Sequence, residues 1–147
     1  MTTSATGKPT EMRPLPVPFW PDAPFDPARA RVSYDAPADE LLVYFNRGRR
    51  PGGVCDPIGL AEGTIAVVYD GETGEIVGVQ GIPFLLGAVR HRPDWAALVW
   101  GKMAGGFGEQ ALNEALPDFV ADVADAFARS GLVGEPLTEL AAGTTGP

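Results

Sequence analysis

Residues 63–84, GTIAVVYDGETGEIVGVQGIPF, decide the fold of this chain. Within them, residues 64–69 and 76–80 are rich in β-branched and aromatic side chains, which favour the pleated, half-buried surface of a strand. Residues 70–75 separate these runs and contain two glycines, an aspartate and a threonine, which are turn-forming residues. Two strand-like runs joined by a short polar segment with glycine predict an antiparallel hairpin.

The first strand of this hairpin has no polar face. Successive side chains of a strand point to opposite faces, and in residues 65–69 both sets are apolar. Such a strand is expected to be covered on both sides. Gly78 and Gly81 in the second strand predict a close neighbour or a bulge at those positions.

A second hairpin is predicted before the first. Residues 31–34 and 41–45 read as short strands, and the turn between them, residues 35–39, has Asp and Pro in favoured turn positions. Glycine and proline punctuate residues 47–53, which therefore form a loop. Residues 54–56 predict a brief strand or a crossing segment.

Helical patterns follow the predicted sheet. Residues 84–89 are apolar and predict a helical turn or a last strand, and Pro93 opens a segment typical of a helix start. The strongest helix is predicted for residues 109–129, with Gly131 as its stop. Pro117 is expected to break or restart this helix near Leu116. Its apolar side chains form one stripe, namely Leu112, Leu116, Phe119, Val120, Val123 and Phe127. Its acidic side chains form another, namely Glu114, Asp118, Asp122 and Asp125.

These elements predict one α+β domain, a small antiparallel sheet of two hairpins covered by C-terminal helices. Residues 1–29 form a proline-rich N-terminal arm, and residues 30–92 form the sheet region. Residues 93–131 form a helical region that packs on the sheet in the same domain. Residues 132–147 form a flexible C-terminal tail.

The N-terminal arm has two interpretations. Seven prolines precede residue 28 and exclude a helix, which is typical of a disordered leader. However, Phe19, Trp20 and Phe25 are aromatic, and exposed aromatic side chains are typical of a contact surface. The alternative is an extended arm that docks these residues on the body of the chain or on a neighbouring subunit.

Composition limits the function classes. The chain has 147 residues, a net charge of −8 and one cysteine, which cannot form an internal disulfide. The negative charge argues against nucleic-acid and membrane-surface partners. No apolar run approaches the length of a membrane span, and the N-terminus lacks a signal-peptide pattern. We therefore expect a cytoplasmic protein. The usage of Ala, Gly, Pro and Arg is typical of a GC-rich bacterial genome.

Two blocks of residues resemble a known family. The first consists of Tyr34, Asp35, Ala38, Asp39, Leu41 and Val43. The second consists of Val68, Asp70, Gly74, Ile76, Val77, Gly78 and Val79. Over residues 31–92 this pattern is similar to the bacterial small-protein family catalogued as domain of unknown function 2283. The chain differs at Leu42, where an aromatic residue is common, at Gln80, where Glu is common, and in its long extensions. The resemblance implies a compact β-rich fold and no reaction.

Catalytic and metal sites find little support in the sequence. Cys55 and His91 are each unique, and a thiolate beside an imidazole would be a nucleophile, but no local pattern places them together. The plain interpretation is a small buried cysteine and a solvated histidine. One Cys and one His exclude a zinc-finger type of site, so no metal and no cofactor are expected.

The basic residues are the most informative charges. Five of the eleven Lys and Arg residues lie in two short segments that could meet in space and bind a phosphate or carboxylate. The candidate anion-binding residues are Arg47, Arg49, Arg50, Arg90, His91 and Arg92. Gly52 and Gly53 could add backbone N–H groups. The alternative, which we favour, is that these arginines pair with the acidic helix stripe within one chain or across a dimer.

We therefore predict a non-enzymatic structural or interaction protein that forms a homodimer or docks on another protein. A small sheet has two edges that need protection, and dimerisation is one solution. The alternative is a binding module for a small anion, and the least expected class is a cysteine-dependent enzyme.

Overall fold

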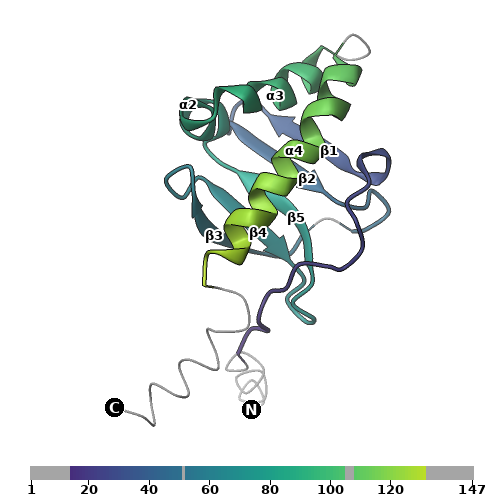
Figure 1. Cartoon of the computed structure of the whole chain (residues 1–147), viewed down its shortest axis with the longest axis vertical. Helices are drawn as coiled ribbons and strands as arrows, with labels where there is room; N and C mark the ends of the chain where they lie inside the picture. The colour runs from purple at the N-terminus through teal and green to yellow at the C-terminus, as the bar shows by residue number, and fades with distance from the viewer. Residues whose placement is uncertain (1–13, 51, 105–107, 132–147) are drawn as a thin grey trace, which may run out of the picture.

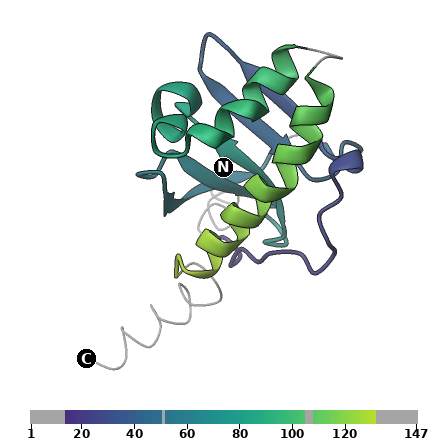
Figure 2. The ribbon, with the colours of Figure 1, turned by 45° about the horizontal axis from the view of Figure 1, so that its top comes forward.

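The hairpin predicted from residues 63–84 lies in the middle of a five-stranded antiparallel sheet. The computed structural model describes residues 14–50, 52–104 and 108–131. The strands are β1 (Arg31–Asp35), β2 (Glu40–Tyr44), β3 (Val54–Leu60), β4 (Ile65–Tyr69) and β5 (Ile76–Gly81), in the spatial order β1-β2-β5-β4-β3. Helices α3 (Ala96–Met103) and α4 (Glu109–Ala128) lie side by side on one face of the sheet (Figures 1 and 2). The predicted α+β class is confirmed.

β3 extends further than the sequence predicts. Instead of a brief strand at residues 54–56, β3 has seven residues and pairs with β4 along the sheet edge. Pro57 is tolerated because an edge strand needs backbone donors on one side only. The register shifts between Pro57 and Leu60, where Gly59 has a φ of +75°.

β4 is buried on both faces, as its apolar pattern predicts. All five of its residues are buried. Ile65, Val67 and Tyr69 belong to the main core beneath the helices, while Val68 packs with Tyr44 in a smaller cluster on the opposite face. Two different parts of the chain therefore cover this strand.

The described part of the loop between β2 and β3, residues 45–50 and 52–53, covers the smaller cluster. It has to cross β5 and β4, because these strands lie between β2 and β3. The Gly52 N–H donates to Tyr44 Oη at 3.1 Å. A Cβ atom on Gly53 would lie 2.9 Å from the Val68 side chain. The loop thus lies directly against the face of the sheet opposite to α3 and α4.

Gly78 is required where β2 and β5 meet. A Cβ atom at this position would lie 2.3 Å from the carbonyl oxygen of Val43, so a side chain would force the strands apart. The pairing register also shifts between Val68 and Tyr69 of the neighbouring strand. Both features that the glycine predicts, a close neighbour and an irregular register, are present.

Asp39 joins the β1–β2 turn to the segment that follows β5. Its carboxylate accepts the N–H groups of Leu85 and Leu86 at 2.8 and 2.9 Å and the Tyr34 hydroxyl at 2.7 Å. Its carbonyl oxygen accepts the Phe84 N–H at 2.8 Å. Burial would raise the pKa of Asp39, but these hydrogen bonds outweigh it and lower the pKa below its ordinary value.

Of the two alternatives predicted for residues 84–89, a helical turn or a last strand, the structure has the helical turn. It comprises a five-residue π-helical turn at Phe84–Ala88 and the short α2 (Val89–His91). A 3₁₀ turn at Pro93–Trp95 then leads into α3, as the sequence predicts for this helix start.

The expected break at Pro117 is wrong, because α4 is one continuous helix of 20 residues that includes this proline. The missing N–H and the ring cost helix stability, but the apolar stripe is buried on both sides of the proline. Leu116, Phe119 and Val120 are at most 3% exposed. Burial of this stripe in the core explains why one imperfect turn does not divide the helix.

The described part of the N-terminal arm docks on its own chain. Phe19 donates its N–H to the Gly74 carbonyl and accepts the Ile76 N–H, both at 2.9 Å. This backbone pairing takes the place beside β5 that β2 leaves when it ends. Trp20 packs against Phe45 and Phe127, with ring centroids 5.4 and 6.0 Å away. A 3₁₀ turn at Pro27–Arg29 then leads into β1.

Parts of the predicted segments lie outside the described residues. These are residues 1–13 of the N-terminal arm and the C-terminal tail at residues 132–147. Within the described ranges, no helix has both the length and the apolar character needed to cross a membrane.

Replacement of Asp39 tests its role in joining the turn to residues 84–86. We expect Asp39→Ala to lower the free energy of unfolding by about 1–3 kcal/mol, because the N–H groups of Leu85 and Leu86 and the Tyr34 hydroxyl lose their acceptor. Asp39→Asn should lose less, since it keeps an acceptor and tolerates the φ of 53° at this position. Urea denaturation at pH 7 measures both changes.

The same variants give a pH dependence of known sign. The folded-state pKa of Asp39 lies below its unfolded value of about 3.9. Its contribution is therefore complete above that value and is lost as the pH falls through the folded-state pKa. The difference between wild type and Asp39→Ala should shrink below about pH 4. Equal stability of the two proteins at pH 7 would contradict this role.

Candidate functional site

The two basic segments lie at opposite ends of the sheet. Tyr44 pairs with Gly78 and Leu41 pairs with Gly81, so β2 ends near the start of β5. The first segment follows that end of β2 and comprises Arg47, Arg49 and Arg50. The second follows the other end of β5 and comprises Arg90, His91 and Arg92. The structure therefore does not bring the six candidate anion-binding residues together.

The guanidinium of Arg49 already forms ion pairs with carboxylates of its own chain. It lies 2.6 Å from Asp70 and 3.8 Å from Glu75, both in the β4–β5 turn. The N–H groups of Glu72 and Thr73, together with Arg49, lower the pKa of Asp70. Arg50, Gly52 and Gly53 line a shallow depression of about 380 Å³ beside this ion pair. The ion pair anchors the crossing loop to the turn.

Arg92 shows the pairing with the acidic helix stripe that we favour. Its guanidinium lies 2.6 Å from Asp122 of α4 and 3.1 Å from Asp94. It also lies over the Trp95 ring, 4.7 Å from the ring centroid. The hydrogen bonds to Asp94 and Asp122 raise the pKa of Arg92, and they lower the pKa of Asp94. His91 Nε2 lies 3.4 Å from a Glu62 carboxylate oxygen.

Cys55 and His91 lie on different sides of the sheet. Cys55 pairs with Val68, whose side chain lies in the cluster on the face opposite to α3 and α4, whereas His91 belongs to α2 on the side of those helices. Cys55 is exposed, so the expectation of a small buried cysteine is wrong. Desolvation, and then the charges of Glu40 and Asp56, raise the pKa of its thiol, which disfavours the nucleophilic thiolate. Within the described ranges, no three potential metal ligands gather.

The three candidate interface residues of the arm make contacts within their own chain. Trp20 and Phe25 are half-buried and both pack against Phe45, with Phe25 at a centroid distance of 5.6 Å. Phe19 uses its backbone for pairing and keeps its side chain 46% exposed. Residues 14–29, the described part of the arm, do not run along the edge of β3 or β1, although the Pro27–Arg29 turn lies at the start of β1.

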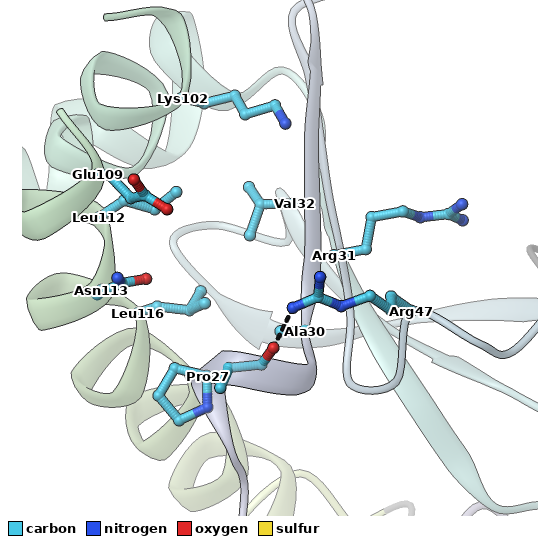
Figure 3. A pocket seen from close by; sticks show the side chains of 11 residues that line it. Pro27, Ala30, Arg31, Val32, Arg47, Lys102, Glu109, Leu112, Asn113 and Leu116 are labelled. Atoms are coloured by element: carbon cyan, nitrogen blue, oxygen red, sulfur yellow. Dashed lines mark hydrogen bonds between the residues drawn. The ribbon is translucent and has the colours of Figure 1, made fainter. Parts of the chain in front are cut away.

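A groove opens between β1 and the helix layer. It has a volume of about 650 Å³ and joins segments that are far apart in the sequence. Its lining residues are Pro27, Ala28, Ala30, Arg31, Val32, Arg47, Lys102, Glu109, Leu112, Asn113 and Leu116. Figure 3 shows Val32 pointing toward the helices, with Lys102 extending toward the strand above it.

The groove has an apolar floor and a charged rim. Val32, Leu112 and Leu116 form the floor, and the last two project from α4. Glu109 and Asn113 project from the same helix, and the Arg31 side chain extends to the other side of β1 (Figure 3). There its guanidinium lies over the Tyr44 ring at 5.2 Å. Arg47 donates to the Ala28 carbonyl oxygen and closes one end of the groove.

The backbone of β1 faces outward beside this groove. Neighbouring residues of a strand direct their N–H and C=O groups to opposite sides. The Phe45 N–H donates to Val77 of β5, so the groups of Val43 also face β5 and those of Leu42 face β1. Ser33, paired with Leu42, therefore bonds to β2. It follows that Val32 and Tyr34 direct their backbone groups away from the sheet.

The opposite edge is blocked. The same alternation directs the backbone groups of Cys55 and Pro57 outward from β3. Pro57 has no N–H to offer, and the irregular register that follows interrupts any continuous pairing. Proline and bulges are devices that protect sheet edges. β1 has neither, so the two edges of this sheet are not equivalent.

Sequence reasoning missed this site. The groove depends on the packing of residues 27–32 and Arg47 against Lys102 and residues 109–116, which no local pattern reveals. One signal was available, because proline within a strand indicates an edge. Pro57 could therefore have identified β3 as a protected edge.

Comparison of the chain with protein-family models, with curated proteins and with solved structures found no match in any of the three. The resemblance to domain of unknown function 2283 therefore stays a prediction. The residues that carry it have structural roles here. Tyr34 and Asp39 share a hydrogen bond, and Gly78 allows the close approach of β2.

Arg92 offers a test between a structural role and an anion-binding role. We expect Arg92→Gln to lower the free energy of unfolding by about 1 kcal/mol, a value reduced by the partial exposure of its ion pairs. Arg90→Gln makes the same charge change at an exposed position and should have little effect. Urea denaturation at low and high salt measures both. Equal stability of Arg92→Gln and wild type would return Arg92 to the anion-site hypothesis.

Proposed function

We propose that this chain is a non-enzymatic protein-interaction module that binds an extended polypeptide strand along β1. The observation that carries the proposal is the unprotected β1 edge beside a groove, on a sheet whose other edge carries Pro57 and a bulge. A protein that protects one edge and leaves the other open has a surface suited to strand addition.

Backbone hydrogen bonds would provide the first part of the recognition. Val32 and Tyr34 each present an N–H and a C=O to an added strand. Such pairing is independent of the partner's sequence, and it positions the partner's side chains alternately on the two faces of the extended sheet. Half of these side chains would point toward the helix layer.

The groove would provide the second part. A side chain beside Val32 on the helix face would lie over the apolar floor formed with Leu112 and Leu116. Lys102 and Glu109 would surround it with one charge of each sign. The groove therefore supports an apolar side chain in the partner, flanked by polar or charged ones.

Binding of a small anion is the weaker alternative. Arg49 and Arg92 are already paired with carboxylates, and the two basic segments lie at opposite ends of the sheet.

An acidic chain with one exposed cysteine also suits the reducing cytoplasm, which we propose as its location.

Site-specific photo-crosslinking tests the proposed edge. Ser33 is exposed and lies between the two outward-facing residues. We expect Ser33→p-benzoylphenylalanine to form an adduct with a polypeptide when cells that produce the protein are irradiated. The same replacement at Pro57 on the other edge, or at Ala121 on α4, should form none. Mass spectrometry of the adduct identifies the bound chain.

Two results would contradict the proposal. One is the absence of any adduct at position 33 in a variant that is folded by circular dichroism. The other is equal adduct formation at positions 33, 57 and 121, which would indicate random collision.

A further inference from the structure

We propose that the strand that binds along β1 is β1 of a second copy, in an antiparallel pairing centred on Ser33. This inference rests on the proposed function, because it requires the β1 edge to be a docking surface. It would join two five-stranded sheets into one continuous sheet around a two-fold axis.

The direction of the backbone groups limits the possible registers. Within β1, only Val32 and Tyr34 direct their backbone groups outward. In a symmetric antiparallel pair, each of them therefore lies opposite either the other residue or its own equivalent in the second copy. If Val32 lies opposite Val32 of the second copy, Asp35 has no residue of the other β1 opposite to it. If Tyr34 lies opposite Tyr34, the same is true of Arg31. Matching Val32 with Tyr34 of the second copy places all five residues of both strands in register.

The charges of β1 are complementary in this register. Arg31 lies directly opposite Asp35 of the second copy, and the two-fold axis repeats this pair. Both side chains belong to the face opposite to α3 and α4, as shown by the pairing of Arg31 with Tyr44 and of Asp35 with Glu40. Opposite charges across an antiparallel pair are stabilising, and like charges are destabilising. The segment Arg-Val-Ser-Tyr-Asp is therefore self-complementary in charge.

The remaining contacts are compatible with this arrangement. Ser33 would lie opposite Ser33 of the second copy in a non-hydrogen-bonded pair, where Cα atoms approach to about 4.5 Å. Serine is small and exposed at this position. On the helix face, Tyr34 of the second copy would lie beside Val32 at the mouth of the groove. Because α3 and α4 cover one face of each sheet and the two-fold axis is perpendicular to the joined sheet, the two helix layers would lie on the same side and the two grooves would face one another.

Exchange of the two charges tests the pairing. Sedimentation equilibrium should give twice the 15.4 kDa mass for the wild type. Arg31→Glu or Asp35→Arg should weaken the dimer about tenfold or more, because each creates two like-charge pairs. The double variant Arg31→Asp/Asp35→Arg should restore it. Arg50→Glu and Glu72→Arg make matched charge changes elsewhere and should leave the dimer unchanged.

The double variant also separates assembly from stability. Arg31→Glu removes the contact with the Tyr44 ring, but the double variant removes this contact too. Recovery of the dimer in the double variant therefore has to come from the restored charge pair. If the partner had a different sequence, this exchange of charges would not restore its binding.

A disulfide across the axis gives an independent test. Ser33→Cys in a Cys55→Ser background should form a covalent dimer on mild oxidation, because a Cα separation of about 4.5 Å suits a disulfide. Ala121→Cys in the same background is the control and should remain reduced.

The outcomes separate this inference from the proposed function. A monomer at about 100 μM, or a dimer that neither responds to the charge variants nor crosslinks at position 33, overturns the second-copy pairing. If the photo-crosslink at position 33 then captures a different protein, the docking edge stands and only its occupant is wrong. If position 33 captures nothing, both proposals fail.

Discussion

The burial of β4 on both faces is the constraint on which the rest of the structure depends. A strand with apolar side chains on both sides needs two covers, and the chain supplies them from different segments. α3 and α4 cover one face, and the described part of the loop between β2 and β3 covers the other. Arg49 and Gly52 fix that loop, while Phe19 fixes the arm beside β5. The two sides of the hairpin thus organise nearly every other element.

Local sequence patterns predicted the parts of the fold that depend on local physics. Both hairpins, the turn after Pro83 and the apolar stripe of α4 follow from periodicity and turn chemistry. The expected break at Pro117 was wrong because tertiary burial outweighed a local penalty. The positions of the two basic segments could not be predicted, because their separation depends on the register of β2 with β5. The groove likewise exists only after distant segments have packed.

The two edges of the sheet differ in how well their backbone groups are protected from pairing with another strand. β3 carries Pro57 and an irregular register, which protect its backbone groups from unwanted pairing. β1 is regular and short, and its polar side chains alternate with Val32 and Tyr34. A short edge flanked by opposite charges favours a matching strand and disfavours an unmatched one. Specificity at such an edge comes from charge order and register more than from buried area.

The strand order also has a consequence for how the chain folds. β3, β4 and β5 are consecutive in sequence and pair as a local meander, whereas β2 has to find β5 across the whole of it. Because local contacts close shorter loops, the meander is expected to form first and the β1–β2 hairpin to join it late. Until then, the side of β5 that pairs with β2, where Val77 and Val79 direct their backbone groups, is open to other strands. A chain that refolds from its full length is therefore most exposed to mispairing at the future centre of its sheet, until the β1–β2 hairpin joins β5.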